Sequence, residues 1–351
     1  MNWLLLFVPL TVALEFLAPD AHTAIFFCSS AAIVPLAGWL GEATGHLAER
    51  TTEGIGGLLN ATFGNAAELI IALMALRGGL YEVVKASLTG SILGNLLLVT
   101  GASILAGGLR YQVQCFNAAG ARIQATMMLL ATAALVMPAA FHHLAGPGGR
   151  SNEATLSFWI AMVLLVTYAA SLWFSLRTHK QFFTTPPGGG SAPGAASRWG
   201  IGRSVLVLAL STAFIAWMSE ILVGSVGAAA QRLGMTSIFI GVIVVAIVGN
   251  AAEHSTAVLA ARDDRMDLAL AISYGSSLQI ALFIAPLLVV ASLFLGPRPM
   301  DLVFTPAEVL AVVAAVLINA QICGDGESNW LEGVQMLAVY VIMGIVFYFL
   351  P

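Results

Sequence analysis

The sequence predicts an all-α polytopic membrane protein of about eleven transmembrane helices that contains an inverted repeat. Three observations support this fold class: the composition, the number of apolar segments and a duplicated motif. Of the 351 residues, 59% are hydrophobic and only 9% are charged, and the mean hydropathy is +0.92. Soluble domains need roughly 25% charged residues to cover their surface. The chain must therefore place most of its surface in lipid.

The composition also excludes several classes of protein. A net charge of -4 and scattered Lys and Arg residues leave no basic face for nucleic acid. The cysteines Cys28, Cys115 and Cys323 show neither metal-ligand spacing nor a disulfide framework, so we interpret them as small buried hydrophobic residues. No basic segment precedes the first apolar stretch, so we expect a retained span rather than a cleaved signal peptide.

Eleven apolar segments are candidates for transmembrane helices. A bilayer core of about 30 Å requires about 20 residues of helix, and charge clusters or Gly/Pro-rich breaks separate the segments. Their approximate limits are residues 2–18, 22–41, 55–76, 80–106, 122–140, 155–176, 203–224, 236–260, 267–292, 305–323 and 334–350.

The Lys and Arg residues in the loops predict the orientation of these spans. With the N-terminus in the cytoplasm, the inner loops hold nine of these residues and the outer loops hold four. An odd number of spans then places the C-terminus outside. We expect an integral, multi-pass protein of a prokaryotic cell membrane with a cytoplasmic N-terminus.

A duplicated motif relates the two halves of the chain. Residues 64–95 and 249–280 align without a gap at a constant offset of 185, and both begin with Gly-Asn-Ala-Ala-Glu. The copies lie in the third and eighth spans, so they cross the membrane in opposite directions. Inverted-topology repeats of this kind are typical of secondary transporters that work by alternating access. Single-span receptors and simple pores do not need them.

A Gly-, Pro-, Ser- and Ala-rich segment lies between the two copies. Residues 181–202 have no apolar periodicity, which predicts a flexible cytoplasmic linker. The linker separates spans two to six from spans seven to eleven. We therefore divide the chain into an N-terminal helix at 1–21, a first repeat at 22–180 and a second repeat at 203–351.

Each copy of the motif carries one glutamate, Glu68 or Glu253, near the middle of an apolar span. An ionised carboxylate there costs at least ~2.5–3.5 kcal/mol, so each should bind a cation, hold a proton or face a water-filled cavity. Asn65 and Asn250 precede the glutamates by three residues and share their helix face. The alternative interpretation is a permanently protonated glutamate bonded to a neighbouring helix.

The first residues of the motif copies, Gly64 and Gly249, permit local unwinding that would expose backbone carbonyls. Carboxylates, carboxamides and carbonyls together make an oxygen-only site, which suits a hard cation such as Ca²⁺. A soft-metal site would need Cys or several His residues, and the motifs lack them.

The spans that follow each motif add polar residues that could complete the coordination or line a pathway: Ser91, Asn95, Ser276 and Gln279. Alternatively, they form ordinary interhelical hydrogen bonds. His254 follows the second glutamate and points about 100° away around the helix. It is a candidate proton relay or gate or, alternatively, a packing residue.

Other acidic residues receive a structural interpretation. We expect Glu15, Glu220 and Glu308, within or at the ends of spans, to reach the surface as end residues. The loop at 324–332 does not match an EF-hand, so we interpret it as a solvated acidic loop.

At these residues the chain resembles the calcium/proton exchanger (CAX) family of the calcium/cation antiporter superfamily. The matching stretches lie in both halves: GLLNATFGNAAELIIAL at 57–73, GSILGNLLLVTG at 90–101, FIGVIVVAIVGNAAEH at 239–254, RMDLALAISYGSSLQIALF at 265–283 and DGESNWLEG at 324–332. The resemblance implies one extra N-terminal helix followed by two inverted five-helix repeats. It also implies exchange of cytoplasmic Ca²⁺ for protons, with Glu68 and Glu253 central and Asn65 and Asn250 beside them.

The expected function is therefore secondary antiport with Ca²⁺ and protons as substrates, without a cofactor and without enzymatic activity. No GxxxxGK[ST] motif is present, so the proton gradient should supply the energy. A sodium-coupled calcium exchanger of the same fold and a cation channel remain alternatives. An intramembrane hydrolase lacks support, because the sequence has no HExxH motif and no nucleophile placed with a His/Asp partner.

Overall fold

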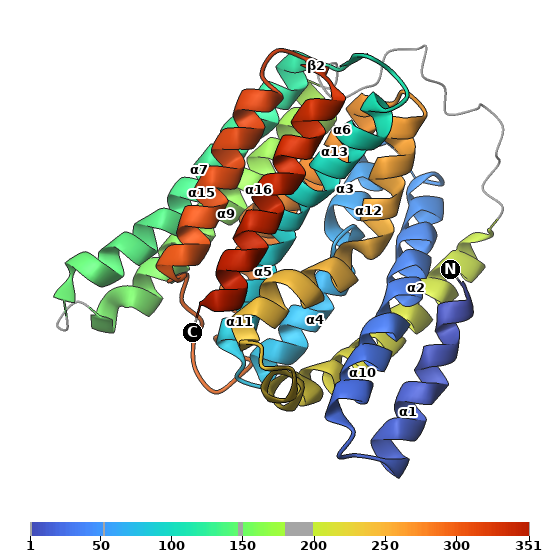
Figure 1. Ribbon diagram of the computed structural model, residues 1–351, viewed down its shortest axis with the longest axis vertical. Helices are drawn as coiled ribbons and strands as arrows, with labels where there is room; N and C mark the ends of the chain where they lie inside the picture. Colours follow the sequence, from blue (N-terminus) through green and yellow to red (C-terminus); the bar gives the residue numbers. More distant parts are fainter. Residues whose placement is uncertain (1, 52, 147–149, 180–198, 351) are drawn as a thin grey trace. The chain divides into compact units, whose positions relative to one another are not determined.

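The computed structural model describes residues 2–51, 53–146, 150–179 and 199–350 (Figure 1). These residues are almost entirely helical, so the predicted fold class is confirmed, and each predicted span coincides with a helical stretch. Before the predicted linker the stretches are, in chain order, η1 (Asn2–Leu6) with α1 (Phe7–Leu17), α2 (His22–Ala48), α3 (Glu53–Phe63) with α4 (Ala66–Arg77), α5 (Tyr81–Leu93) with η2 (Gly94–Val99) and α6 (Thr100–Gly108), α7 (Ala118–Leu144), and η3 (Arg150–Asn152) with α9 (Glu153–Trp173) and η4 (Phe174–Thr178). After the linker they are α10 (Ile201–Leu233), α11 (Ser237–Phe239) with η6 (Ile240–Val245) and α12 (Ala246–Arg262), α13 (Met266–Gln279) with η7 (Ile280–Ile284) and α14 (Ala285–Ala291), α15 (Pro306–Ile322), and α16 (Trp330–Phe349).

Eight of the described helices are long and apolar enough to cross a membrane. With a composition of 59% hydrophobic and 9% charged residues, this makes the chain an integral multi-pass membrane protein. Two further apolar helices, Asn2–Leu17 and Pro306–Ile322, are shorter. The remaining predicted span is divided by a break between α3 and α4. Eleven membrane crossings therefore stay a prediction.

The structure divides into two compact units that do not coincide with the halves of the sequence. Unit 1 comprises the described parts of residues 1–87 and 190–252, and unit 2 comprises those of residues 88–189 and 253–350. Each unit combines elements from both sides of the predicted linker at 181–202. Residues 180–198 of the chain lie outside the described residues, and the domain division made from the sequence stays a prediction.

In unit 1, α2 packs along α10, α1 packs against α2, and α4 packs against both α2 and α10 (Figure 1). The helices α2 and α10 begin the two predicted repeats. Their buried side chains include Phe26, Ile33, Met218, Leu222 and Ala229. Lipid tails are as apolar as these side chains, so close packing rather than the hydrophobic effect holds such helices together.

In unit 2, α7 packs against α15, α9 against α14, and α6 against α16. Glycines allow the last pair to approach closely. A Cβ on Gly108 would lie 2.5 Å from the Trp330 backbone nitrogen, and one on Gly333 would lie 2.5 Å from that of Leu105. Small residues at such crossings are typical of helix packing in membranes.

Four π-helical segments, η2, η4, η6 and η7, adjoin α-helices in the described residues. The segments η2 and η7 follow α5 and α13, which correspond in the two repeats. A π-helical turn departs from the regular i to i-4 bonding of an α-helix, and side chains bond to carbonyls of η2. Thr100 Oγ1 donates to the Asn95 carbonyl at 2.9 Å, and Asn319 Nδ2 donates to the Leu96 carbonyl. These bonds fix the segment that carries Asn95.

A short antiparallel sheet in unit 2 joins two connections between helices: β1 (Gln114–Cys115) pairs with β2 (Glu327–Ser328). The acidic loop at 324–332 is thus partly ordered by backbone pairing, while Glu327 is exposed. This sheet could not be predicted from the sequence, because each strand has only two residues.

Two structural expectations need correction. Cys115 is exposed, whereas Cys28 is half-buried and Cys323 is buried. The expectation of burial is wrong for Cys115, because this residue lies in a connection rather than in a span. Glu220 is exposed, as expected, but the Glu308 side chain is almost fully buried. Glu308 accepts hydrogen bonds from Thr305, the residue before α15, and from Thr89 of α5, so it does not reach the surface.

Candidate cation site

The first copy of the motif interrupts a helix. The helix α3 ends at Phe63 and α4 begins at Ala66, and Gly64 and Asn65 form a turn between them. Asn65 is buried with φ -103° and ψ 32°, and helical bonding resumes from Leu69 N to Asn65 O at 3.1 Å. The local unwinding expected at Gly64 is therefore present.

Glu68 lies in the first turn of α4. A helix N-terminus favours negative charge, because its backbone N–H groups lack helical partners. The break at the motif therefore does more than expose backbone, since it also places the carboxylate at the positive end of a new helix. A continuous helix would not provide this electrostatic support for an ionised glutamate.

Within unit 1, Glu68 lies directly against the first residue of the second motif. A Cβ added to Gly249 would be 3.0 Å from Glu68 Cγ and 3.3 Å from Glu68 Oε1. Both distances are shorter than ordinary side-chain contact, so glycine is what allows the glutamate to lie against the backbone of α12. Gly249 thus allows the Glu68 side chain to approach the backbone of α12 closely.

The second copy of the motif does not unwind. The helix α12 runs from Ala246 to Arg262 through Gly249 and Asn250, so the expected exposure of carbonyls at Gly249 is wrong. The Asn250 side chain folds back on its own helix, where Nδ2 donates to the Ala246 carbonyl at 2.9 Å. The irregular backbone lies earlier instead, in the π-helical segment Ile240–Val245.

Within unit 2, Glu253 is held by a chain of hydrogen bonds. The Ser276 hydroxyl of α13 bonds to the Glu253 carboxylate, and Asn95 Nδ2 donates to Ser276 Oγ at 2.8 Å. Ser276 has a single proton, so it donates to the carboxylate while it accepts from Asn95. This chain orients one carboxylate oxygen.

The structure differs at the second carboxylate oxygen of Glu253, Oε2. Glu253 Oε2 is buried and has no hydrogen-bond partner among the residues that the structure describes. Most buried polar atoms in proteins are paired, and an unpaired carboxylate oxygen in an apolar helix needs an explanation. A bound cation or a proton would satisfy it.

A second hydrogen bond joins the same helices. Thr100 Oγ1 donates to Ser273 Oγ at 3.0 Å, so two polar contacts link the stretch from α5 to α6 with α13. Ser91 and Gln279, which the sequence also marked, are buried on α5 and α13. Of the two interpretations given for these polar residues, interhelical bonding is present at Asn95 and Ser276. These bonds also support Glu253.

His254 lies beside Glu253 on α12 and is half-buried. Its Nε2 atom is buried and has no hydrogen-bond partner within the described ranges. Burial without a partner disfavours a charged imidazole ring. The proton relay and the packing residue therefore both remain interpretations of His254.

The described residues contain no group of three or more His, Cys, Asp or Glu side chains that could hold a metal ion. A cation bound at the motifs would therefore rely on carboxamide, hydroxyl and backbone oxygens as well as carboxylates. Ca²⁺ accepts such mixed oxygen ligands readily. Glu68 belongs to unit 1 and Glu253 to unit 2.

Paired polar motifs in apolar helices, each with one carboxylate, define the class: a multi-pass membrane protein built for ion movement. The chain belongs to the sodium/calcium exchanger protein family, whose sequence profile matches residues 21–177 and again residues 203–349. The profile thus matches both halves of the chain, and both copies of the motif fall inside it.

Relatives and a solved structure cover almost the whole chain. The Ca(2+)/H(+) antiporter of Aphanothece halophytica is 44% identical over 99% of this chain and 96% of its own length. Ca(2+)/H(+) antiporter ChaA of Bacillus subtilis is 44% identical over 95% of this chain and 93% of its own. The structure of native YfkE superposes with a TM-score of 0.83 at 41% identity, covering 99% of this chain and 100% of that one. The resemblance to the calcium/proton exchangers is confirmed.

Proposed function

We propose that the protein is a secondary active antiporter that exchanges cytoplasmic Ca²⁺ for protons by alternating access. The observation that carries the proposal is Glu253, whose buried Oε2 lacks a hydrogen-bond partner in the described part of the chain. The Ca(2+)/H(+) antiporters that match nearly the whole chain support the same pair of substrates. The proposal excludes enzymatic turnover and needs no cofactor.

Protons and Ca²⁺ compete for the same carboxylates in this mechanism. Burial in an apolar helix disfavours the charged form of a carboxyl group, so the empty site holds protons. Ca²⁺ requires deprotonated ligands, and its binding therefore releases those protons. Alternation of the two inverted repeats then exposes the loaded site to each side of the membrane in turn.

We assign Ca²⁺ coordination to Glu68, Glu253, Asn65 and Asn250, and proton coupling to the two glutamates together with His254. The burial of both asparagines supports their inclusion, as does the need for oxygen ligands other than carboxylates. A further set of residues supports the site or lines the pathway: Gly64, Gly249, Ser91, Asn95, Ser276 and Gln279.

Transport by sealed vesicles containing the purified protein tests the proposal. An imposed proton gradient should drive Ca²⁺ uptake, and uptake should collapse when a protonophore removes the gradient. A sodium gradient at clamped pH tests the sodium-coupled alternative, which the family description keeps open. Uptake driven by sodium alone would indicate a sodium-coupled exchanger, and Ca²⁺ flux without any counter-ion would indicate a channel.

We further propose a location in the cell membrane with a cytoplasmic N-terminus, based on the Lys and Arg distribution. Cys115 provides a natural probe, because it is exposed in the connection between α6 and α7. With this orientation a membrane-impermeant maleimide should label Cys115 only after the cells are permeabilised. The Cys115→Ser variant is the control. Labelling of Cys115 in intact cells would show that the N-terminus lies outside the cytoplasm.

A further inference from the structure

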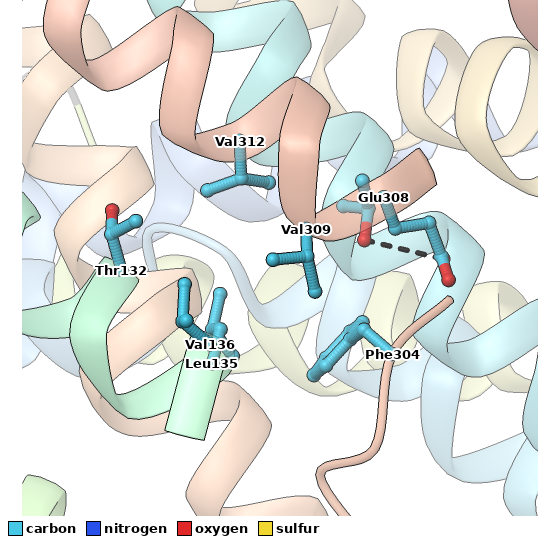
Figure 2. Close-up of a pocket in the computed structure, with 8 residues that line it drawn as sticks. Thr132, Leu135, Val136, Phe304, Glu308, Val309 and Val312 are labelled. Atoms are coloured by element: carbon cyan, nitrogen blue, oxygen red, sulfur yellow. Dashed lines mark hydrogen bonds between the residues drawn. The ribbon is translucent and has the colours of Figure 1, made fainter. Parts of the chain in front are cut away.

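Another acidic residue of unit 2 lies in a small apolar pocket, away from the repeated motif. Glu308 occupies the first turn of α15 and its side chain is only 3% exposed. Figure 2 shows this pocket between α15, α7 and the segment that leads into α15. Its apolar lining consists of Leu135, Val136, Phe304, Val309 and Val312.

Both oxygens of the Glu308 carboxylate accept hydrogen bonds. Oε2 accepts from the Thr305 backbone nitrogen at 2.9 Å and from Thr305 Oγ1 at 2.8 Å. Oε1 accepts from Thr89 Oγ1 of α5 at 3.3 Å, the dashed contact in Figure 2. The bonds to Thr305 form a capping box, a common way to begin a helix.

The capping box alone does not explain the burial of Glu308. The helix α16 begins with the same arrangement, in which Asn329 and Glu332 bond reciprocally. Glu332 is only half-buried. A glutamate can therefore cap a helix of this protein without an apolar pocket. The burial of Glu308 in its pocket and its contact with Thr89 are therefore not needed for capping.

The pocket also contains empty space beside the carboxylate. A cavity of about 10 Å³ is lined by Glu308, Thr89 and Thr132 among apolar side chains. A buried water needs about 10–15 Å³ of such space and two to four polar partners. The lining is mostly apolar and the Thr132 hydroxyl donates to the Met128 carbonyl at 2.8 Å, so the space gives the carboxylate an apolar surrounding rather than a bound water.

Two opposing effects act on the charge of Glu308. The apolar lining disfavours the carboxylate, while the three donors and the start of α15 favour it. Among the residues that line the pocket, from α5, α7, α15 and the segment before α15, Glu308 is the only titratable group. A change in its charge is therefore a change in the charge of the pocket lining.

We propose that Glu308 is a third proton-binding site of this protein, which acts on α5 through its hydrogen bond to Thr89. When the proton binds at Oε1, the carboxyl O–H can donate to Thr89 Oγ1, and the Thr89 hydroxyl changes from donor to acceptor. Thr89 lies on α5, the helix that also carries Ser91. The proton on Glu308 thus acts on a helix that leads to Asn95.

A spectroscopic experiment tests proton binding without relying on transport. Infrared difference spectra of the purified full-length protein are recorded from acid to alkaline pH in the absence of Ca²⁺. We expect a protonated-carboxyl band that is absent in Glu308→Gln and present in Glu68→Gln and Glu253→Gln. If the spectrum of Glu308→Gln keeps every protonated-carboxyl band of the wild-type protein, the proposal is wrong.

Glu308→Gln suits this test because glutamine also serves in a capping box. The Thr305→Ala variant is the matched control, since it removes the capping hydroxyl and keeps the carboxyl group. Thr305→Ala should lower the melting temperature but retain the infrared band. If Glu308→Gln instead lowers the melting temperature in the same way and leaves every carboxyl band in place, Glu308 is a helix cap only.

The effect on transport rests on the proposed Ca²⁺/H⁺ exchange, whereas the proton site itself does not. In vesicles, Glu308→Gln should shift the pH midpoint of Ca²⁺ flux by on the order of one unit, a tenfold change in proton concentration. Glu332→Gln, the corresponding change in the capping box of α16, should leave the midpoint in place. Failure of the wild-type protein to exchange Ca²⁺ for protons would refute the proposed function, and the infrared result would still decide the role of Glu308.

Discussion

The two copies of the Gly-Asn-Ala-Ala-Glu motif have the same sequence and different backbones. In the first copy the chain leaves the helix at Gly64 and starts a new helix at Ala66. In the second copy α12 continues through Gly249 and Asn250, and the irregular segment lies upstream at Ile240–Val245. The pentapeptide permits unwinding, but the sequence around it decides where the irregular backbone falls.

The glutamates of the two copies consequently receive different support. Glu68 lies at a helix N-terminus and packs on Gly249. Glu253 lies inside a continuous helix and depends on the hydroxyl of Ser276, which Asn95 orients. One carboxylate is thus stabilised by backbone dipoles and close packing, and the other by a side-chain network. Variants that affect only one kind of support can separate the two copies.

The largest effect is expected from removing the charge of either glutamate. Glu68→Gln and Glu253→Gln keep the size of the side chain but remove the ligand that both Ca²⁺ and protons require. Each variant should reduce proton-driven Ca²⁺ uptake in vesicles to background while the protein still inserts and folds. Glu82→Gln, an exposed residue at the start of α5, is the matched control and should transport normally.

The result also bears on the comparison between the copies. Near-normal uptake by one of the two variants would remove that copy from the ion site. If the purified variants no longer elute as folded protein, the glutamate has a structural role and the alternative of a permanently protonated residue gains support.

The next effect concerns the network around Glu253. Ser276→Ala removes the hydroxyl that bonds to the carboxylate, and a hydrogen bond to a charged group contributes about 1.5–3 kcal/mol. Ca²⁺ binding should weaken by about 10- to 100-fold, as measured by calorimetry at alkaline pH. Ser277→Ala is the control, because Ser277 Oγ bonds to Ser273 O of its own helix at 2.9 Å. Equal affinities in the two variants would contradict a positioning role for Ser276.

The comparison between copies also marks the limit of what the sequence could predict. Helical spans follow from long apolar segments, and the repeat with Glu68 and Glu253 follows from a gapless alignment. The contact of Glu68 with Gly249 could not be predicted, since it joins residues 181 positions apart and glycine carries no periodic signal. Glu308 was recognisable as a helix cap from the Thr-x-x-Glu spacing, but its burial depends on side chains of α7.

A smaller effect should follow from filling the space at Gly249. In Gly249→Ala the new Cβ would lie 3.0 Å from Glu68 Cγ, so the glutamate must move by a few tenths of an ångström. Overpacking of this kind costs at least about 1 kcal/mol, and Ca²⁺ affinity should fall by about fivefold. Gly275→Ala is the control, since a Cβ there meets nothing within 4 Å. Unchanged binding in Gly249→Ala would show that Glu68 does not depend on this contact.

The smallest effect is expected at His254, which has no equivalent in the first copy, where Leu69 occupies the corresponding position. Protonated carboxylates are poor ligands, so Ca²⁺ affinity of the wild-type protein must weaken as pH falls. His254→Ala removes a group that can carry protons but should leave the carboxylates in place. The variant should therefore shift the pH profile of transport and keep substantial Ca²⁺ binding at alkaline pH.

Ca²⁺ binding measured across pH, in wild type and variant, distinguishes a role of His254 in proton transfer from a role in Ca²⁺ coordination. Binding that does not change with pH in the wild type would refute proton competition, and loss of alkaline binding in the variant would make His254 part of the ion site.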